Sequence, residues 1–230
     1  MKKAFIGCVI AVTCATSAYA ALSTAEQNRL RDAAAVLREL RAVPDKGIPE
    51  ELWSKAECVA VIPSMKKAAL GIGGEYGRGV LSCRTSESWS APLFLQLAKG
   101  SWGLQIGAQE IDLVLLVMNR RGVEKLLDNN ISLGADASVA AGPIGRAANA
   151  STDLAMSAEM LAYSRSRGVF AGIDISGGVL KPDKDANTDA YGDSVKPRDV
   201  VFTSTVKAPP AAREFLTTLS RQALATSGRK

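Results

Sequence analysis

Residues 100–119 read GSWGLQIGAQEIDLVLLVMN, a glycine-rich polar segment that runs directly into an apolar run broken by one aspartate. Glycines inside short apolar and polar runs are typical of strands with bulges or sharp bends. The stretch therefore predicts strands at Leu104–Ala108 and Ile111–Met118. No metal-ligand set or phosphate loop accompanies it. We interpret these residues as the scaffold of a bent sheet, with the apolar run in the core.

The same alternation extends to both sides of this stretch and predicts further strands. Towards the N-terminus, the glycine-rich residues 71–79 continue the bent-sheet pattern. Gly168 lies between two strand candidates, Met160–Arg167 and Val169–Ile175, and could join them as a hairpin. The segment Arg121–Asn129 has helical character. The remaining candidates are strands at Cys58–Ile62, Leu93–Leu97, Ile131–Ala141, Met160–Arg167 and Val169–Ile175, and a helix at Arg121–Asn129.

Helical patterns lie at both ends of the chain. Ser23 and Glu26 have the spacing of a capping box, and apolar residues then recur at helical intervals to about Arg41. A short second helix begins after Pro49, and a closing amphipathic helix follows Pro210. The sequence thus predicts an α+β fold, a strongly curved antiparallel sheet or partial barrel with N- and C-terminal helices in a single domain.

The first twenty residues have the three parts of a secretory signal peptide. Lys2 and Lys3 form the charged start, an apolar centre follows, and Ala18 and Ala20 form a small-x-small cleavage site. The apolar centre is shorter than the roughly 20 residues that span a bilayer, which favours removal over retention as an anchor. A lipoprotein signal is the third reading. We expect a mature domain of residues 21–230 that is exported, to the periplasm or to a membrane surface.

Composition excludes several classes of function. The chain has no histidine, which removes the most frequent proton-transfer residue and metal ligand at neutral pH. The net charge of +5 and the aromatic content of 5% are too low for a dedicated nucleic-acid binder. The sequence contains no P-loop, and no base could activate a serine nucleophile in a histidine triad. We therefore expect a binding protein without a cofactor, not an enzyme.

Two cysteines, Cys58 and Cys83, remain after removal of the leader. In an oxidising compartment they are candidates for a disulfide, which would stabilise the fold by roughly 3 kcal/mol in the chain-entropy model. The alternative is two buried free thiols.

An acidic segment near residue 190 places oxygen ligands at every second position, as the start of a calcium loop does. The candidate ligands are Asp183, Asp185, Asn187 and Asp189. The sequence has Thr188 where the turn needs glycine and Ser194 where a bidentate glutamate belongs, so the segment is not an EF-hand. A solvated acidic turn or short surface helix is the favoured interpretation.

Basic residues carry the binding hypothesis. Arg165 and Arg167 alternate with serines, so in an extended strand both guanidinium groups project from one face about 6 to 7 Å apart. That spacing suits the anionic oxygens of a phosphate-bearing head group. We expect Lys66, Lys67 and Arg78 to extend this patch where the sheet folds back. The alternative is an ordinary solvated face with scattered charges.

Six motifs in succession resemble those of the SYLF-domain family. They are GGEYGRGVLSCR at residues 73–84, WSAPLF at 89–94, the opening stretch, LGADASVAAGPIGRAANASTD at 133–153, YSRSRGVFAGIDISGG at 163–178 and NTDAYG at 187–192. The resemblance covers roughly residues 52–193, and six motifs in order are far more specific than any one glycine pattern.

The resemblance implies non-catalytic binding of anionic phospholipids, and in some fungal members binding of actin. Because an exported bacterial protein does not meet actin, we expect it to bind a lipid surface of the envelope through the basic patch. The alternative is a structural envelope protein, or a module that binds a protein partner, with the sheet as the contact surface.

Overall fold

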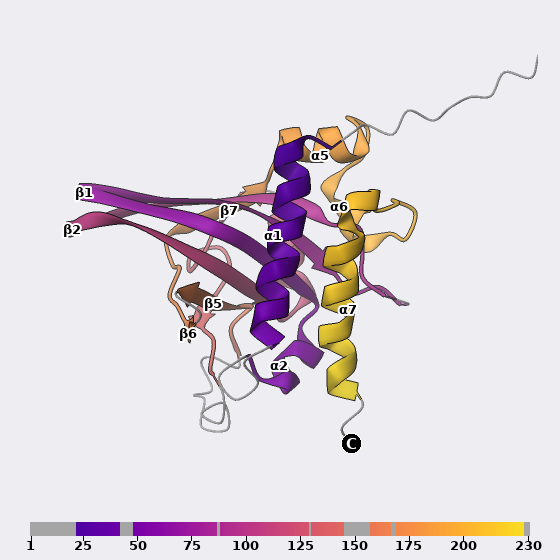
Figure 1. Cartoon of the computed structure of the whole chain (residues 1–230), viewed down its shortest axis with the longest axis horizontal. Coiled ribbons are helices and arrows are strands. Elements are labelled where there is room, and N and C mark those ends of the chain that lie inside the picture. Colours follow the sequence, from indigo (N-terminus) through magenta and orange to yellow (C-terminus); the bar gives the residue numbers. More distant parts are fainter. Residues whose placement is uncertain are drawn as a thin grey trace, which may run out of the picture.

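Two long strands form the centre of the molecule, as a computed structural model shows (Figure 1). Strand β1 spans Cys58–Cys83 and β2 spans Leu93–Val117, and the two pair antiparallel over almost their whole length. The prediction of three separate strands within β2 is wrong, because the glycines bend the β1–β2 ribbon without ending its pairing. The structure describes residues 22–41, 48–86, 88–128, 130–144, 157–166 and 169–227.

The β1–β2 ribbon folds back on itself. Its register shifts between Leu70 and Ile72, and such a bulge bends a ribbon strongly. The second half of β1 then lies against the first half, close enough that a Cβ atom on Gly79 would stand 2.2 Å from the carbonyl oxygen of Val61. Gly77 makes a similarly close approach, to the side chain of Ile62. These glycines allow the two halves of β1 to meet.

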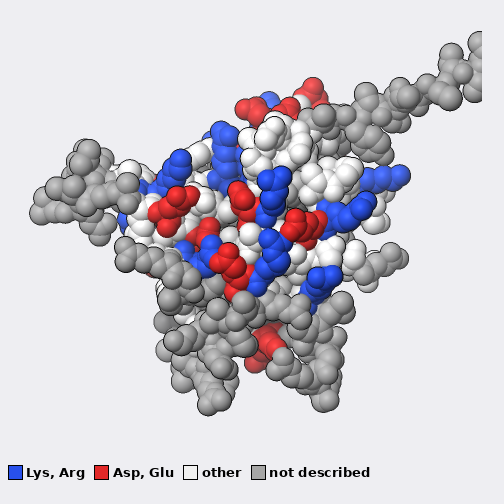
Figure 2. Space-filling model, in the orientation of Figure 1, with Lys and Arg blue, Asp and Glu red and all other residues white. Residues whose placement is uncertain are grey.

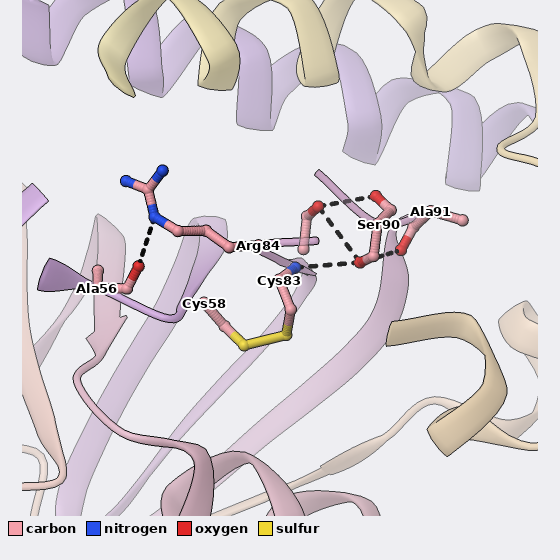
Figure 3. Close-up of a disulfide and its surroundings, with 7 residues drawn as sticks. Ala56, Cys58, Cys83, Arg84, Ser90 and Ala91 are labelled. Atoms are coloured by element: carbon pink, nitrogen blue, oxygen red, sulfur yellow. Dashed lines mark hydrogen bonds between the residues drawn. A yellow bond between two sulfur atoms is a disulfide. The ribbon is translucent and has the colours of Figure 1, made fainter. Parts of the chain in front are cut away.

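A disulfide joins the two ends of β1 (Figure 3). The sulfur atoms of Cys58 and Cys83 are bonded across a sequence separation of 25 residues. Directly after the second cysteine, the guanidinium group of Arg84 donates hydrogen bonds to the carbonyl oxygens of Ala56 at 2.9 Å and Trp53 at 2.8 Å. The folded-back shape of β1 is therefore fastened at its base.

The shorter strands extend the ribbon into a strongly curled half-barrel. The first half of β2 pairs with β7 (Gly178–Pro182), which pairs in turn with β3 (Ile131–Ser132). The second half of β2 pairs with β5 (Met160–Ser166), whose far edge carries β4 (Val139–Ala141) and β6 (Val169–Gly172). The β4–β5 pair is parallel and the other described pairs are antiparallel. The expected α+β fold with a curved sheet is confirmed, although the sheet is mixed.

One predicted strand is interrupted. The segment 131–141 forms β3 and β4, with a turn between them at Gly134, whose φ is +91°. The amide of Gly134 donates to the carbonyl oxygen of Ala137, and the Asp136 carboxylate accepts from the amide of Ser132. These local hydrogen bonds turn the chain, so that β4 joins β5 while β3 joins β7.

Helices cover the sheet from outside and close one end. Helices α1 (Thr24–Arg41), α2 (Glu50–Lys55) and α7 (Arg213–Ser227) lie on its outer face (Figure 1). The amide of Ser23 donates to the Glu26 carboxylate at 2.7 Å, which confirms the capping box. The other helical elements among the described residues are α3 (Arg120–Asp128), α5 (Lys184–Tyr191), α6 (Pro197–Phe202) and the 3-10 turn η2 (Pro210–Ala212).

The curl of the sheet creates two apolar cores. One lies between its outer face and the helices, where Leu30 and Leu37 of α1 and Phe215 of α7 are fully buried. The other fills the concave side, where Leu113 and Leu115 of β2 meet α3 and α6. Because alternate residues of β2 enter opposite cores, its C-terminal half reads as a continuous apolar run.

Candidate binding face

The ribbon extends well beyond the helices that cover its base. In Figure 1, β1 and β2 project past α1 to the left of the view, so their outer face there has no helix above it. The last covered position is Phe94, which is fully buried, with the guanidinium carbon of Arg29 of α1 5.3 Å from its ring centroid. Past this point the outer face of the sheet changes from apolar to mixed.

Three neighbouring strands share this uncovered surface. In the register of the sheet, Tyr76 of β1 lies opposite Ala98 of β2, which lies opposite Val179 of β7. In the next row towards α1, Arg78 of β1 lies opposite Gln96 of β2, which lies opposite Lys181 of β7. Directly paired residues project from the same face of a sheet. We call this surface the arm face, and its members are Tyr76, Arg78, Gln96, Ala98, Val179 and Lys181.

Two large apolar side chains are exposed on the arm face. Tyr76 is 44% exposed and Val179 is 37% exposed, and these are the exposed large hydrophobic residues of the described chain. Their strands flank the same central strand, so their Cα atoms lie about 10 Å apart. An apolar pair that a fold places together in water, with charges beside it, marks a contact surface more often than isolated exposed residues do.

Both cations of the arm face remain accessible. Arg78 is 53% exposed, and its Nε donates a hydrogen bond of 2.7 Å to the Tyr76 hydroxyl. This hydrogen bond raises the pKa of Arg78, so the guanidinium stays charged. Its contact with the Asp183 carboxylate is long, at 4.0 Å. No ion pair of Lys181 is found within the described part of the chain.

A rigid frame supports the inner end of the arm face. The buried side chains of Arg29 and Asp183 form an ion pair at 3.0 Å. Nearby, the Asn187 side chain accepts from the amide of Phe94 and donates to its carbonyl oxygen, both at 2.9 Å. These contacts fix helix α5 to strand β2 beside the arm face.

These contacts also place the acidic segment. Asp183 precedes α5 and pairs with Arg29, while Asn187 is engaged with β2. Asp185 and Asp189 lie exposed on the helix. The four side chains thus belong to a helix and its start rather than to a loop around one ion. Within the described residues, no group of three or more cysteine and acidic side chains could hold a metal.

Arg165, the described member of the proposed arginine pair, is not a free charge. Arg165 donates to the Asp112 carboxylate at 2.7 Å and also pairs with Glu39 of α1. Its side chain is only 19% exposed. Two carboxylates therefore already neutralise the guanidinium group. Arg167 lies outside the described residues.

The two lysines of the hypothesis differ in their surroundings. Lys67 forms an ion pair at 2.9 Å with Glu75, whose side chain is 7% exposed, and so links the two halves of β1. Lys66 is exposed and lies opposite Glu110 in the register. Among the predicted basic residues that the structure describes, Lys66 and Arg78 keep accessible charges, and of these two Arg78 belongs to the arm face.

A polar cavity of about 650 Å³ lies on a different part of the molecule, beside α3. Lys125, one of the two basic residues that line it, forms an ion pair at 3.1 Å with Glu159, whose carboxylate also accepts from the amide of Ser138. The charged groups of the cavity thus largely neutralise one another. The lining residues are Asn119, Arg121, Lys125, Gly134, Ala135, Asp136, Ser138, Ser157 and Glu159.

The helical face of the molecule carries mixed charge. Figure 2 shows lysine and arginine side chains interspersed with aspartate and glutamate over the residues drawn in colour. On this face Arg38 of α1 pairs with Glu214 of α7, and both are about half exposed. Such a surface of mixed charge attracts neither anions nor cations strongly.

Sequence reasoning missed Tyr76, Val179 and Lys181. The signal was present for Tyr76 and Arg78, which alternate with glycines in GGEYGRG as outward residues of a strand do. Lys181 had no such signal, because only the pairing of β7 with β2 places it beside Gln96.

Comparison with known proteins identifies the fold family. The family model described as Ysc84, Las17-binding protein actin regulator, matches residues 98–222. That is more than half of the chain. The chain belongs to the Ysc84 family. This match confirms the family that the sequence motifs predicted.

Relatives of the Ysc84 family occur in animals and fungi. The human SH3 domain-containing YSC84-like protein 1 is 32% identical over 83% of this chain and 57% of its own length. In Saccharomyces cerevisiae, Protein YSC84 is 32% identical over 78% of this chain and 39% of its own length, and LAS seventeen-binding protein 3 is 30% identical over the same shares. The chain therefore spans about 40 to 60% of these relatives.

Proposed function

We propose that this Ysc84-family domain is a non-catalytic module that binds an anionic phospholipid surface through the arm face. The single observation that carries the proposal is the uncovered row of Arg78, Gln96 and Lys181 across three strands. Two accessible cations in one row, about 10 Å apart, can bind two neighbouring phosphate head groups. Because the ribbon projects beyond the helices, its outer face there can approach a membrane (Figure 1).

The proposed location is the bacterial envelope. The leader-like pattern of residues 1–20 supports export, after which the domain would meet the anionic lipids of a membrane surface. No helix in the described chain has both the length and the hydropathy to cross a bilayer. The contact we propose is therefore peripheral. The lack of histidine supports a binding role over a catalytic one.

Vesicle co-sedimentation of the domain tests the proposal. The double variant Arg78→Gln with Lys181→Gln removes both cations of the arm face, and Arg213→Gln with Arg221→Gln removes two exposed cations of α7 as a matched control. Each basic residue at an anionic surface contributes about 1 kcal/mol, so the arm variant should bind phosphatidylglycerol vesicles roughly thirtyfold more weakly. The α7 control should bind within about twofold of the wild type.

Two results would contradict the proposal. One is equal binding of the wild type to vesicles of phosphatidylglycerol and of phosphatidylcholine at low salt, because an electrostatic contact distinguishes the two. The other is an equal loss in both double variants, which would show that net charge acts without the arm face.

A protein partner is the second candidate function. The family description names a Las17-binding actin regulator, and two fungal relatives carry related names. The arm face would serve such a contact by the same cations and apolar pair. Three results together would favour this function over the lipid surface. The domain would purify with one stoichiometric protein partner, the double variant Arg78→Gln with Lys181→Gln would lose that partner, and the domain would not bind vesicles.

A further inference from the structure

The arm face combines its cations with an apolar pair that charge attraction alone does not require. Tyr76 and Val179 stand one row further from α1 than Arg78 and Lys181, on the same face. A purely electrostatic contact would be served equally well by polar residues here. Ala98 between them has a small side chain, so the two larger side chains rise on either side of it.

The arrangement also fixes the depth of each group. The Tyr76 hydroxyl accepts the hydrogen bond from Arg78, which turns the polar end of the tyrosine towards the cation row. The guanidinium carbon of Arg78 lies 5.9 Å from the centroid of the tyrosine ring. Tyrosine side chains favour the boundary between head groups and acyl chains, while arginine reaches the phosphates above it. The two rows therefore match two levels of a membrane interface.

From these rows we propose that the arm face inserts Tyr76 and Val179 into the interface of an anionic bilayer while Arg78 and Lys181 hold the head-group phosphates. This inference rests on the proposed function and adds the orientation of the bound domain. The projecting end of the β1–β2 ribbon meets the membrane, with the row of Tyr76 and Val179 deeper than the row of Arg78 and Lys181, and α7 lies towards the other end of the ribbon (Figure 1).

An environment-sensitive nitrobenzoxadiazole dye attached at Tyr76→Cys tests the insertion. The experiment uses residues 21–230, which leave out Cys8 and Cys14, and the remaining native Cys58 and Cys83 are bonded to each other and do not react with the dye. On phosphatidylglycerol vesicles the emission at residue 76 should shift to the blue and should be quenched by lipids labelled in the upper acyl chain. The matched control is Thr217→Cys on the exposed surface of α7, where neither change should occur.

The double variant Tyr76→Ser with Val179→Ser separates apolar from charged contacts. Both positions are exposed, so the variant should melt as the wild type does. Salt screens the attraction of the cations but not the apolar contact. In high salt the variant should bind vesicles roughly a hundredfold more weakly than the wild type, as expected for the loss of two inserted side chains at about tenfold each.

The outcomes distinguish this inference from the proposed function. Vesicles that bind the dye-labelled domain while emission at residue 76 stays that of water would overturn the insertion and leave the lipid contact standing. A blue shift at Thr217 instead would place α7 on the membrane and also overturn it. If the wild type does not bind vesicles at all, both the proposed lipid contact and the proposed insertion are wrong. A shift produced only by a protein partner would assign the arm face to the second candidate function.

Discussion

At the scale of single residues, a glycine allows the two halves of β1 to approach each other closely. A Cβ atom at residue 79 would meet the backbone oxygen of Val61 at 2.2 Å, and a backbone atom cannot move aside as a flexible side chain can. No positive φ is involved, so the requirement for glycine comes from the approach of the two halves of β1 alone. The folded-back ribbon depends on this contact.

We expect Gly79→Ala to lower the free energy of unfolding by about 3 kcal/mol, the upper part of the range for overpacked cores. Chemical denaturation of the folded domain measures it. Gly100→Ala is the matched control in β2, since nothing lies within 4 Å of the added Cβ there. The control should be neutral or more stable by up to about 1 kcal/mol. Equal effects of the two substitutions would contradict the close approach.

Two arginines show which properties of the site the sequence predicts and which it does not. Arg78 is recognisable as an outward residue because it alternates with Gly77 and Gly79, which face inward. Arg165 shows the same alternation, yet Asp112 and Glu39 neutralise it. Those partners come from a distant strand and a distant helix, and the sequence gives no sign of their proximity. Local spacing predicts the direction of a side chain but not its neighbours.

At the scale of elements, helices were predicted more accurately than strands. The capping box and the apolar period predict α1 within one residue of its start, because both signals are local. The bounds of β2 depend on long-range pairing with β1, which local patterns do not contain. Helix α6, which has six residues, was not predicted.

The disulfide has its effect at the level of one element, strand β1. By closing a loop of 25 residues it restricts the unfolded chain, which amounts to about 3 kcal/mol in the chain-entropy model. We expect the double variant Cys58→Ser with Cys83→Ser to lower the free energy of unfolding by that amount. Chemical denaturation should show this as a lower midpoint concentration of denaturant. A reducing agent should shift the wild type towards the variant and leave the variant unchanged.

The same variant tests what holds the two halves of β1 together. Between them lie the ion pair of Lys67 with Glu75 and the contact of Gly79 with Val61, neither of which involves the cysteines. We therefore expect the double variant to keep its near-ultraviolet circular dichroism below its transition. A spectrum without tertiary signal in native buffer would show that the disulfide, and not the packing, folds the ribbon back.

At the scale of the whole molecule, the response to pH follows from which groups the fold buries. Without histidine, few side chains change charge near neutrality. Two tyrosines do respond at alkaline pH, since burial raises the pKa of both Tyr163 and Tyr191. Tyr163 is fully buried, and its hydroxyl has no hydrogen-bond partner in the described part of the chain, whereas the Tyr191 hydroxyl donates to the carbonyl oxygen of Pro92.

The sign of the effect is fixed by the direction of these pKa shifts. In the unfolded chain a tyrosine loses its proton near pH 10, at about its ordinary pKa, while the folded chain keeps both protons. Above that pH the unfolded state binds fewer protons, so the free energy of unfolding should fall by about 1.4 kcal/mol per pH unit for each tyrosine. Denaturation curves from neutral to strongly alkaline pH should show a plateau and then this decline. Tyr163→Phe with Tyr191→Phe should flatten the decline by roughly 2.7 kcal/mol per pH unit, whatever its stability at neutral pH. An unchanged slope would mean that the two hydroxyls already ionise in the folded protein, and that solvent reaches both cores of the half-barrel.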